Sequence, residues 1–244
     1  MSDVTGPDGS VAETAPLVSV VIPVYNCEAY LAEALDSVLA QTYRPVEIIV
    51  VDDGSSDRSA SVAARYSGVR CLTQPHAGAG AARNLGAASA SGSFLAFLDA
   101  DDLWVSDKLE SQMAAFRASP ALDMVSGYVR QFHSPELGAD VKARLAGAGT
   151  VLPGHVHTML VKRSSFGRVG PLPTHWRLGE FIDWYATAKE LGLNCVLVPK
   201  VVTLRRLHGS NMGIRERDAR ADYLKILKGV LDRRRRGAAQ QDAT

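Results

Sequence analysis

Residues 94–110 read FLAFLDADDLWVSDKLE, a stretch in which an apolar run ends in a cluster of carboxylates. Phe94–Leu98 has the composition of a buried strand. Asp99, Asp101 and Asp102 follow it within four positions. Like charges this close repel and raise each other's pKa, so such a cluster needs a cation or a set of hydrogen-bond donors beside it. The stretch therefore predicts a ligand site at the carboxyl end of a buried strand.

Similar apolar runs alternate with amphipathic segments through the first half of the chain. This alternation predicts an α/β fold, with a parallel sheet covered by helices on both faces. We expect strands over 18–22, 46–51, 69–73 and 94–98. We expect helices around 31–39, over 58–66 and 80–90, and after Ser106, which is the expected cap of its helix.

Candidate ligand-binding residues follow three of these strands. They are Pro23–Tyr25, Asp52–Asp53 and Asp99–Asp102. Ligands of open parallel sheets bind beyond the carboxyl ends of the strands, so we expect these groups to meet at one edge. Hard cations such as Mg²⁺ or Mn²⁺ prefer carboxylate oxygens, often together with substrate phosphates.

The second half is less regular. We expect strands over 125–132, 196–198 and 201–204, and one at the edge of the sheet over 156–161. A helix with Phe181, Trp184, Tyr185, Ala188 and Leu191 on one face follows the edge strand, and a last helix runs over about 218–235.

Composition narrows the class of protein. The 244 residues are 46% hydrophobic and 22% charged, as in ordinary soluble domains, and the net charge of +1 gives no support to nucleic-acid binding. Charge is uneven, however, with −9 over residues 1–57 and +8 over 200–236. Arg233–Arg236 is either a solvated helix end, which we favour, or a peripheral contact with an anionic membrane.

Three separated cysteines are typical of the reducing cytoplasm and give no thiolate metal site. Residues 1–16 lack the regions of a signal peptide and predict a disordered lead-in. No apolar stretch approaches the roughly 20 residues of a spanning helix. The expected location is therefore cytoplasmic, with the inner face of the membrane as the alternative.

Four ordered motifs carry a resemblance to a known family. They are SVVIPVYN (19–26), EIIVVDDGSSD (47–57), GAGAARNLG (78–86) and FLAFLDADDLW (94–104). In order and spacing the chain resembles family 2 glycosyltransferases over residues 17–118, and more loosely through GEFIDW and RRLHGSN to about 211. The resemblance implies a GT-A fold and inverting transfer of a sugar from a nucleotide-diphosphate donor, usually a UDP-sugar. The linker near 133–154 divides one continuous domain into a nucleotide-sugar-binding half (17–132), an acceptor half with the C-terminal helix (133–236), and a tail (237–244).

Five residues are implied on the nucleotide side of the site. Pro23 and Tyr25 would line the nucleobase pocket, and Asp53 would accept a hydrogen bond from the base. Arg83 would lie near the nucleotide, with a surface arginine as its alternative, and Asp99 would contact the ribose.

The resemblance also implies a metal site with Mn²⁺ or Mg²⁺. Asp101 would bind the ion that bridges the diphosphate, and His208 would approach it from the late segment RRLHGSN. Trp104 would form a wall of the donor pocket. Arg205 and Arg206 would add charge there, with one of the two facing solvent.

The general base is where the sequence departs from the family. Many relatives have Glu-Asp at the start of the acceptor-side helix, but Phe181 stands at the usual aspartate position. Glu180 and Asp183 lie on neighbouring parts of one helical face, so either can serve as base. Glu180 is preferred because it begins the helix nearest the strand tips. Asp183 alternatively anchors the helix or touches the acceptor.

Three other classes compete with a transferase. A response-regulator receiver would be about half as long, and a sugar-nucleotide pyrophosphorylase would have a glycine-rich basic loop after the first strand. A non-catalytic sugar-nucleotide-binding module is the strongest rival because of the altered acidic motif. For the acceptor, the sequence leaves open a saccharide, a lipid carrier, a peptide or a small molecule.

Overall fold

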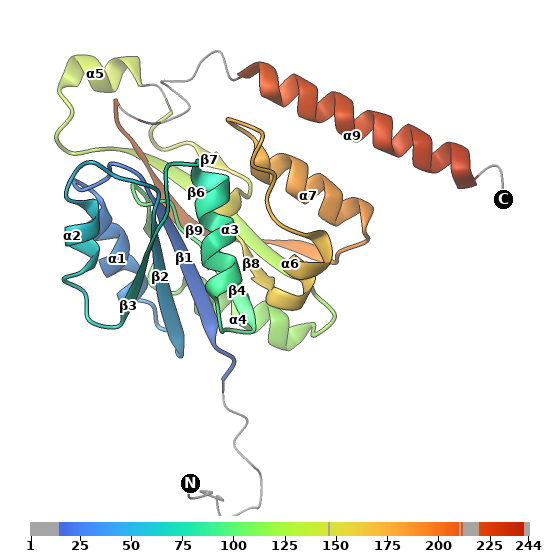
Figure 1. Cartoon of the computed structure of the whole chain (residues 1–244), viewed down its shortest axis with the longest axis horizontal. Helices are drawn as coiled ribbons and strands as arrows, with labels where there is room; N and C mark the ends of the chain where they lie inside the picture. The colour runs from blue at the N-terminus through green and yellow to red at the C-terminus, as the bar shows by residue number, and fades with distance from the viewer. Residues whose placement is uncertain (1–14, 146, 210, 212–219, 242–244) are drawn as a thin grey trace, which may run out of the picture.

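The computed structural model describes residues 15–145, 147–209, 211 and 220–241. Its centre is a nine-stranded sheet in the order β3-β2-β1-β4-β8-β6-β9-β5, with β7 paired to β6 (Figure 1). Helices lie on both faces of the sheet, so the expected α/β class is confirmed. The expected lead-in over 1–16 falls outside the described residues except for its last two positions.

The four strands that the sequence predicts for the first half of the chain are present. They are β1 (Val18–Val24), β2 (Val46–Asp52), β3 (Val69–Thr73) and β4 (Phe94–Phe97). All pair in parallel, and Val20 lies beside Ile48 of β2 and Ala96 of β4. Every residue of β1 and β4 is buried, because helices cover both faces and leave no polar side to alternate.

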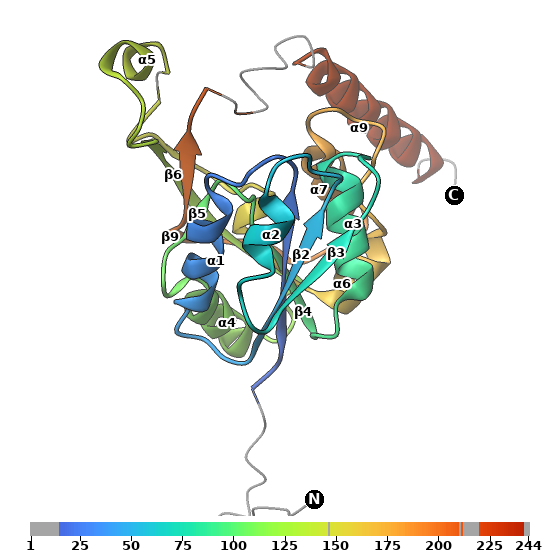
Figure 2. The same ribbon diagram turned by 60° about the vertical axis from the view of Figure 1, so that its left-hand side comes forward.

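Two apolar cores lie on opposite faces of this sheet (Figure 2). α1 (Leu31–Leu39), α2 (Ser59–Ala63) and α4 (Lys108–Ala118) pack on one face. α3 (Ala79–Ser89), α6 (Arg163–Val169) and α7 (Glu180–Glu190) pack on the other. Gly86 brings α3 close to β1, since a Cβ there would lie 2.3 Å from Val21 Cγ1. This close packing holds α3 against the sheet.

The second half adds the remaining strands and the outer helices. These are β5 (Leu103–Trp104), β6 (Met124–His133), α5 (Ala139–Arg144), β7 (Val151–Leu152), the 3₁₀ turn η1 (Val156–Thr158), β8 (Leu160–Lys162), β9 (Cys195–Leu207) and α9 (Arg220–Gln241). β9 is one strand of 13 residues and not two, with irregular register against β6 near Tyr128.

Three sequence expectations need correction. The predicted edge strand over 156–161 is η1 followed by β8, and β8 lies inside the sheet, antiparallel between β4 and β6. Ser106 does not cap α4, which begins at Lys108 after Asp107 without a side-chain cap. α9 continues to Gln241, so the described part of the expected tail is helical; positions 218–219 of the expected helix lie outside the described residues.

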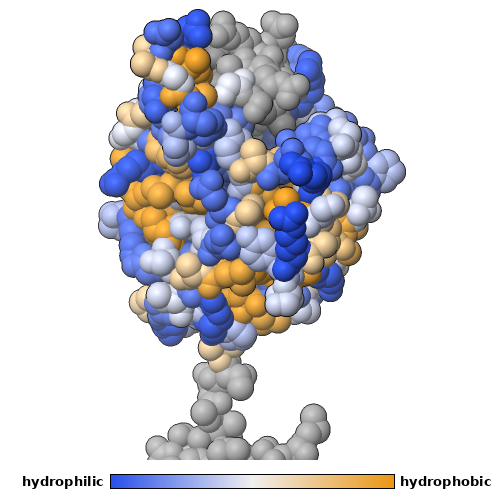
Figure 3. Space-filling model, turned by 90° about the vertical axis from the view of Figure 1, so that its left-hand side faces the viewer, coloured by the Kyte–Doolittle hydropathy of each residue, from blue (hydrophilic) through white to orange (hydrophobic). Residues whose placement is uncertain are grey.

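The surface is mixed in character. On the side drawn in Figure 3, apolar patches are separated by hydrophilic residues. None of the described helices combines the length and the apolar composition that a bilayer span requires.

Candidate active site

The carboxyl ends of β1, β2 and β4 meet at one edge of the sheet. Val24 is level with Asp52, and the backbone N–H of Asp53 donates to Val24 O at 2.8 Å. The N–H of Leu98 donates to Val21 O at 3.1 Å, which brings the acidic stretch after β4 to the same edge. The expected meeting of the three strand ends is therefore confirmed.

Asp53 organises the loop that follows β3. Its carboxylate is buried and accepts hydrogen bonds from the Gln74 side chain (2.6 Å) and from the N–H groups of Ala77 and Gly78 (both 2.8 Å). His76 Nδ1 lies 2.8 Å from the same carboxylate. These partners use the four acceptor directions of a carboxylate, so Asp53 holds the loop in the shape seen here.

That loop completes an aromatic surface. The His76 ring stacks on Tyr25 with centroids 4.0 Å apart, and Tyr25 is 47% exposed. Pro23 is buried in β1, two positions before Tyr25. A flat pair of rings at the strand tips can receive a nucleobase. Sequence reasoning missed His76, whose only signal is its place just after a strand in QPH.

Arg83 links the two halves of the site. Its guanidinium is 5% exposed and lies 2.5 Å from Asp99 and 2.6 Å from Glu180. Burial would lower the pKa of Arg83, but the two carboxylates outweigh burial and raise the pKa above its ordinary value. The same interaction helps to hold the pKa of Asp99 well below its usual range, against the effect of burial. Arg83 is thus a buried connector from α3 to the end of β4 and the start of α7, and the surface alternative is excluded.

His157 is a second buried cation that sequence reasoning missed. Its Nδ1 lies 2.8 Å from Asp102 and 3.3 Å from Asp99. Burial opposes the charged ring, yet the two carboxylates raise the pKa of His157 to about 9. Burial also raises the pKa of Asp102, to about 6, with His157 acting in the opposite direction. At neutral pH the crowded aspartates are therefore compensated by Arg83 and a protonated His157.

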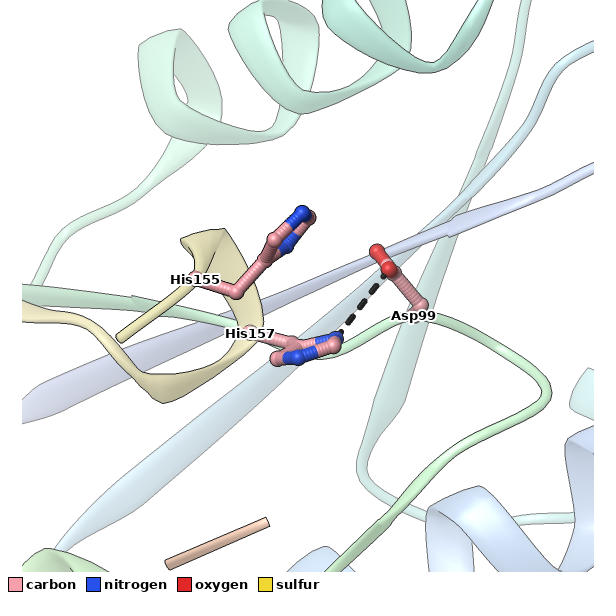
Figure 4. Close-up of side chains that lie close together, drawn as sticks. All are labelled: Asp99, His155 and His157. Carbon is pink, nitrogen blue, oxygen red and sulfur yellow. Dashed lines mark hydrogen bonds and ion pairs between the residues drawn. The ribbon is translucent and has the colours of Figure 1, made fainter. Parts of the chain in front are cut away.

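His155 and His157 both project from η1 toward Asp99 (Figure 4). Ligand atoms of these three residues lie within 4.8 Å of one another, as a metal site would require. The charges argue against a cation at this position, because Asp99 already faces Arg83 and the His157 ring. Burial of the His155 ring and the nearby positive charge of His157 lower the pKa of His155.

Asp101 and His208 form a better set of metal ligands. His208 Nε2 lies 2.9 Å from Asp101 Oδ2, and the Asn211 side-chain amide donates to the same oxygen at 3.3 Å. The Asp101 side chain is 26% exposed, so it keeps surface toward a ligand. A carboxylate oxygen beside an imidazole nitrogen suits Mn²⁺ and, with substrate phosphates, Mg²⁺. The predicted pair is thus brought together, and Asn211 is an addition.

Arg206 holds the acidic stretch Asp99–Asp102 in place. Its backbone N–H donates to Asp102 at 2.8 Å, and its Nε donates to Asp101 O at 3.0 Å. The guanidinium reaches Glu33 on α1 at 2.8 Å and lies between two aromatic rings, those of Tyr30 and Phe132, each centred 4.9 Å away. Arg206 is fully buried, so its role is to stabilise the acidic stretch.

Trp104 supports the site from behind. The indole is 4% exposed, belongs to the core under α1 and α4, and donates from Nε1 to His157 O at 3.0 Å. The expectation of a donor-pocket wall needs correction, because the ring has almost no surface that faces a donor. It fixes the η1 turn that carries His157.

Glu180 and Asp183 point to different neighbours. Glu180 begins α7 and lies beside Arg83 at the strand tips, with its side chain 16% exposed. Asp183 accepts hydrogen bonds from Trp176 Nε1 (2.8 Å) and Arg233 (3.0 Å). Of the two candidates, only Glu180 adjoins the cluster around Asp99, whereas Asp183 fastens α9 to α7.

Comparisons with known proteins identify the family. The family model described as Glycosyl transferase family 2 matches residues 19–166, more than half of the chain. An uncharacterized glycosyltransferase of Rickettsia typhi is 44% identical over 100 residues, which cover 41% of this chain and 31% of that protein. An uncharacterized glycosyltransferase of Nostoc sp. is 31% identical over 220 residues, covering 80% of this chain and 66% of that protein. The chain thus spans between about one third and two thirds of these two relatives.

Two solved structures share the fold. Staphylococcus aureus TarS in complex with UDP-GlcNAc has a TM-score of 0.63 at 19% identity, covering 80% of this chain and 60% of that one. The mannosyltransferase PcManGT from Pyrobaculum calidifontis, in complex with GDP-Man and Mn²⁺, has a TM-score of 0.67 at 22% identity, covering 86% and 62%. The fold is therefore GT-A, as the resemblance implied. Together, the four motifs at the strand tips and the match of the family model show that this chain belongs to glycosyl transferase family 2.

Proposed function

We propose that the protein transfers a sugar, with inversion, from a nucleoside-diphosphate donor to an acceptor hydroxyl or amine. The observation that carries this proposal is the buried Arg83, which joins Asp99 of the expected donor side to Glu180 of the expected acceptor side at 2.5 and 2.6 Å. Membership of glycosyl transferase family 2 supports the reaction class. The donors named with the two fold neighbours, UDP-GlcNAc and GDP-Man, support a nucleotide-sugar substrate.

The donor would bind along the strand tips. Tyr25 and His76 offer the stacked rings for the nucleobase, and Pro23, in β1, lies two positions before Tyr25. Asp53 would act on the base indirectly, by holding the loop that carries His76, because its acceptor directions are already used. A uracil is the expected base. Asp99 would face the ribose, because it follows β4 on the same edge.

A divalent cation, Mn²⁺ or Mg²⁺, would be held by Asp101 and His208, with Asn211 beside them. Such an ion, when bound, supplies positive charge that stabilises a departing diphosphate. The fold keeps the two ligands next to each other. Arg206 supports this position through its hydrogen bonds to Asp101 and Asp102.

Glu180 is the proposed general base. An acceptor hydroxyl must lose a proton as it attacks the anomeric carbon, and a carboxylate within reach can take it. Glu180 stands at the start of α7, where Arg83 fixes its Oε1 at 2.6 Å. Asp183 is assigned to anchoring α9, because Trp176 and Arg233 occupy its two oxygens.

A screen of nucleotide sugars by thermal shift, with and without Mn²⁺, tests the proposal. A donor that binds the native state raises the melting temperature by mass action. The active enzyme should then hydrolyse that donor slowly without acceptor, and Asp101→Ala should abolish the hydrolysis. Donor binding with no turnover in any acceptor mixture would favour the non-catalytic binding module instead.

A further inference from the structure

α9 presents an apolar stripe that no described part of the chain covers. Leu224, Leu227 and Leu231 are 72%, 53% and 54% exposed. Their spacing of three and four places them on one side of the helix. Clustered exposed leucines are unusual on a soluble surface and mark an interaction site. In both ribbon views α9 lies along the outside of the molecule, beside α7 (Figures 1 and 2).

The opposite side of α9 is firmly docked. Ile226 and Val230 are buried at 1% and 8% exposure. A Cβ at Gly179 would lie 2.7 Å from Ile226 Cδ1, so the helix sits directly on the start of α7. Arg233 pairs with Asp183 at 3.0 Å and Glu190 at 2.9 Å, so this arginine is a brace and not part of a solvated helix end. The leucines therefore face outward because the inner side is already fixed.

Basic residues border the stripe. Lys228 and Arg235 stand four positions after Leu224 and Leu231, on the same side of the helix, and both are exposed. Residues 220–241 contain seven Lys or Arg and only two acidic residues. One of these, Asp222, is paired with Lys225 at 3.2 Å. The outward side of α9 thus combines leucines with a net positive charge.

We propose that α9 is an interfacial helix that lies on an anionic lipid surface with this leucine stripe inserted. Helices with an apolar stripe, flanking Lys or Arg and low overall hydrophobicity bind in the plane of the membrane interface, whatever their length. Long basic side chains beside the stripe reach the headgroups while their stems stay in apolar surroundings. This contact goes beyond the proposed transfer reaction and does not depend on it.

Charge selects the lipid surface over a second copy of the chain. In a two-fold pairing of α9 helices, the same surface meets itself, so the basic borders would face basic borders. The two acidic residues of the helix are too few to compensate them. Anionic headgroups supply the missing negative charge, and each basic residue near such a surface adds to the attraction.

Flotation of the full chain with vesicles of equal parts phosphatidylcholine and phosphatidylglycerol tests the proposal. The wild type should float with these vesicles at low salt and not with pure phosphatidylcholine. Leu224→Ser with Leu227→Ser should weaken binding at least about tenfold, because burying a leucine contributes on the order of tenfold in a partition constant. Leu39→Ser with Leu152→Ser, at leucines 43% and 39% exposed on other elements, is the matched control and should bind normally.

A second variant, with two basic residues replaced by acidic ones, separates the electrostatic from the apolar contribution to binding. Lys228→Glu with Arg235→Glu should reduce binding to the anionic vesicles about tenfold or more. Absence of wild-type flotation, or equal binding by the Leu224/Leu227 variant, overturns the proposal. A concentration-dependent dimer that the same serine variant disperses, without vesicle binding, overturns it in favour of a second copy. Donor binding measured on the same proteins reports on the transferase proposal separately, and it should not change in either variant.

Discussion

His208 Nε2 lies 2.9 Å from Asp101 Oδ2, although 107 positions separate the two residues in the chain. Asp101 comes from the acidic stretch after β4, whereas His208 follows the last strand of the sheet, β9. The two residues come together because β9 runs beside β5, with Leu204 opposite Leu103. The end of β9 therefore lies next to the acidic stretch Asp99–Asp102, the DADD segment. The proposed metal site is therefore made by the two halves of the domain together.

Asp101→Asn should weaken Mn²⁺-dependent donor binding and lower turnover by about a hundredfold or more, since it removes the anionic ligand of the cation that would stabilise the departing diphosphate. Isothermal titration with the donor, with and without Mn²⁺, measures the first effect. Asp107→Asn is a suitable control, because Asp107 pairs with Lys200 and lies outside the site. Equal Mn²⁺ dependence in the wild type and Asp101→Asn would contradict the assignment.

Arg83→Met should cost about 3 kcal/mol or more of unfolding free energy, because it removes the cation shared by two largely buried carboxylates and leaves Asp99 with only the longer contact to His157. Chemical denaturation gives the value. Arg117→Met removes an exposed pair with Glu110 and should cost no more than about 1 kcal/mol. If the two variants lose similar stability, the buried connection does not hold the site as described.

Glu180→Gln should lower turnover by a factor of about 10² to 10⁴ and leave donor binding intact, as expected when a general base is removed. Asp183→Asn should instead lower the melting temperature, since Asp183 holds Trp176 and Arg233. Steady-state kinetics and thermal melts of both variants separate these roles. Unchanged turnover in Glu180→Gln would refute the base assignment.

Stability should fall with rising pH through His157. Its pKa is raised from 6.5 to about 9 in the folded chain, so the charged ring stabilises the fold fully below pH 6.5. That contribution is lost as the pH rises through about 9. Urea denaturation across this range should give a steeper loss for the wild type than for His157→Gln. Parallel curves for the two proteins would show that the ring carries no charge in the folded state.

The first half of the fold could be predicted because its signals are local. Buried parallel strands are continuous apolar runs, and Pro23, Asp52 and Asp99 lie within two residues of their ends. β8 could not be placed in the same way. It has three residues, and its position between β4 and β6 depends on pairing with distant strands.

The site was predictable to the same extent. Asp99, Asp101 and Glu180 follow from strand ends, a helix start and family motifs. His157 was not predictable, because a single histidine in a turn has no spacing that indicates two carboxylate partners. The packed position of Trp104 was missed for a related reason. A tryptophan beside acidic residues looks available to a ligand until β5 pairs with β9 and buries it.

Glu180 and His208 stand late in the sequence, and this position has a consequence for biosynthesis. A nascent chain that has reached residue 166, where the family match ends, already contains the four parallel strands and the aspartates of the DADD segment. It lacks Glu180, the second carboxylate that pairs with Arg83, and the imidazole that pairs with Asp101. Ribosomal synthesis therefore delivers the four parallel strands before Glu180 and His208, so a product truncated before residue 208 would contain these strands without the complete candidate site.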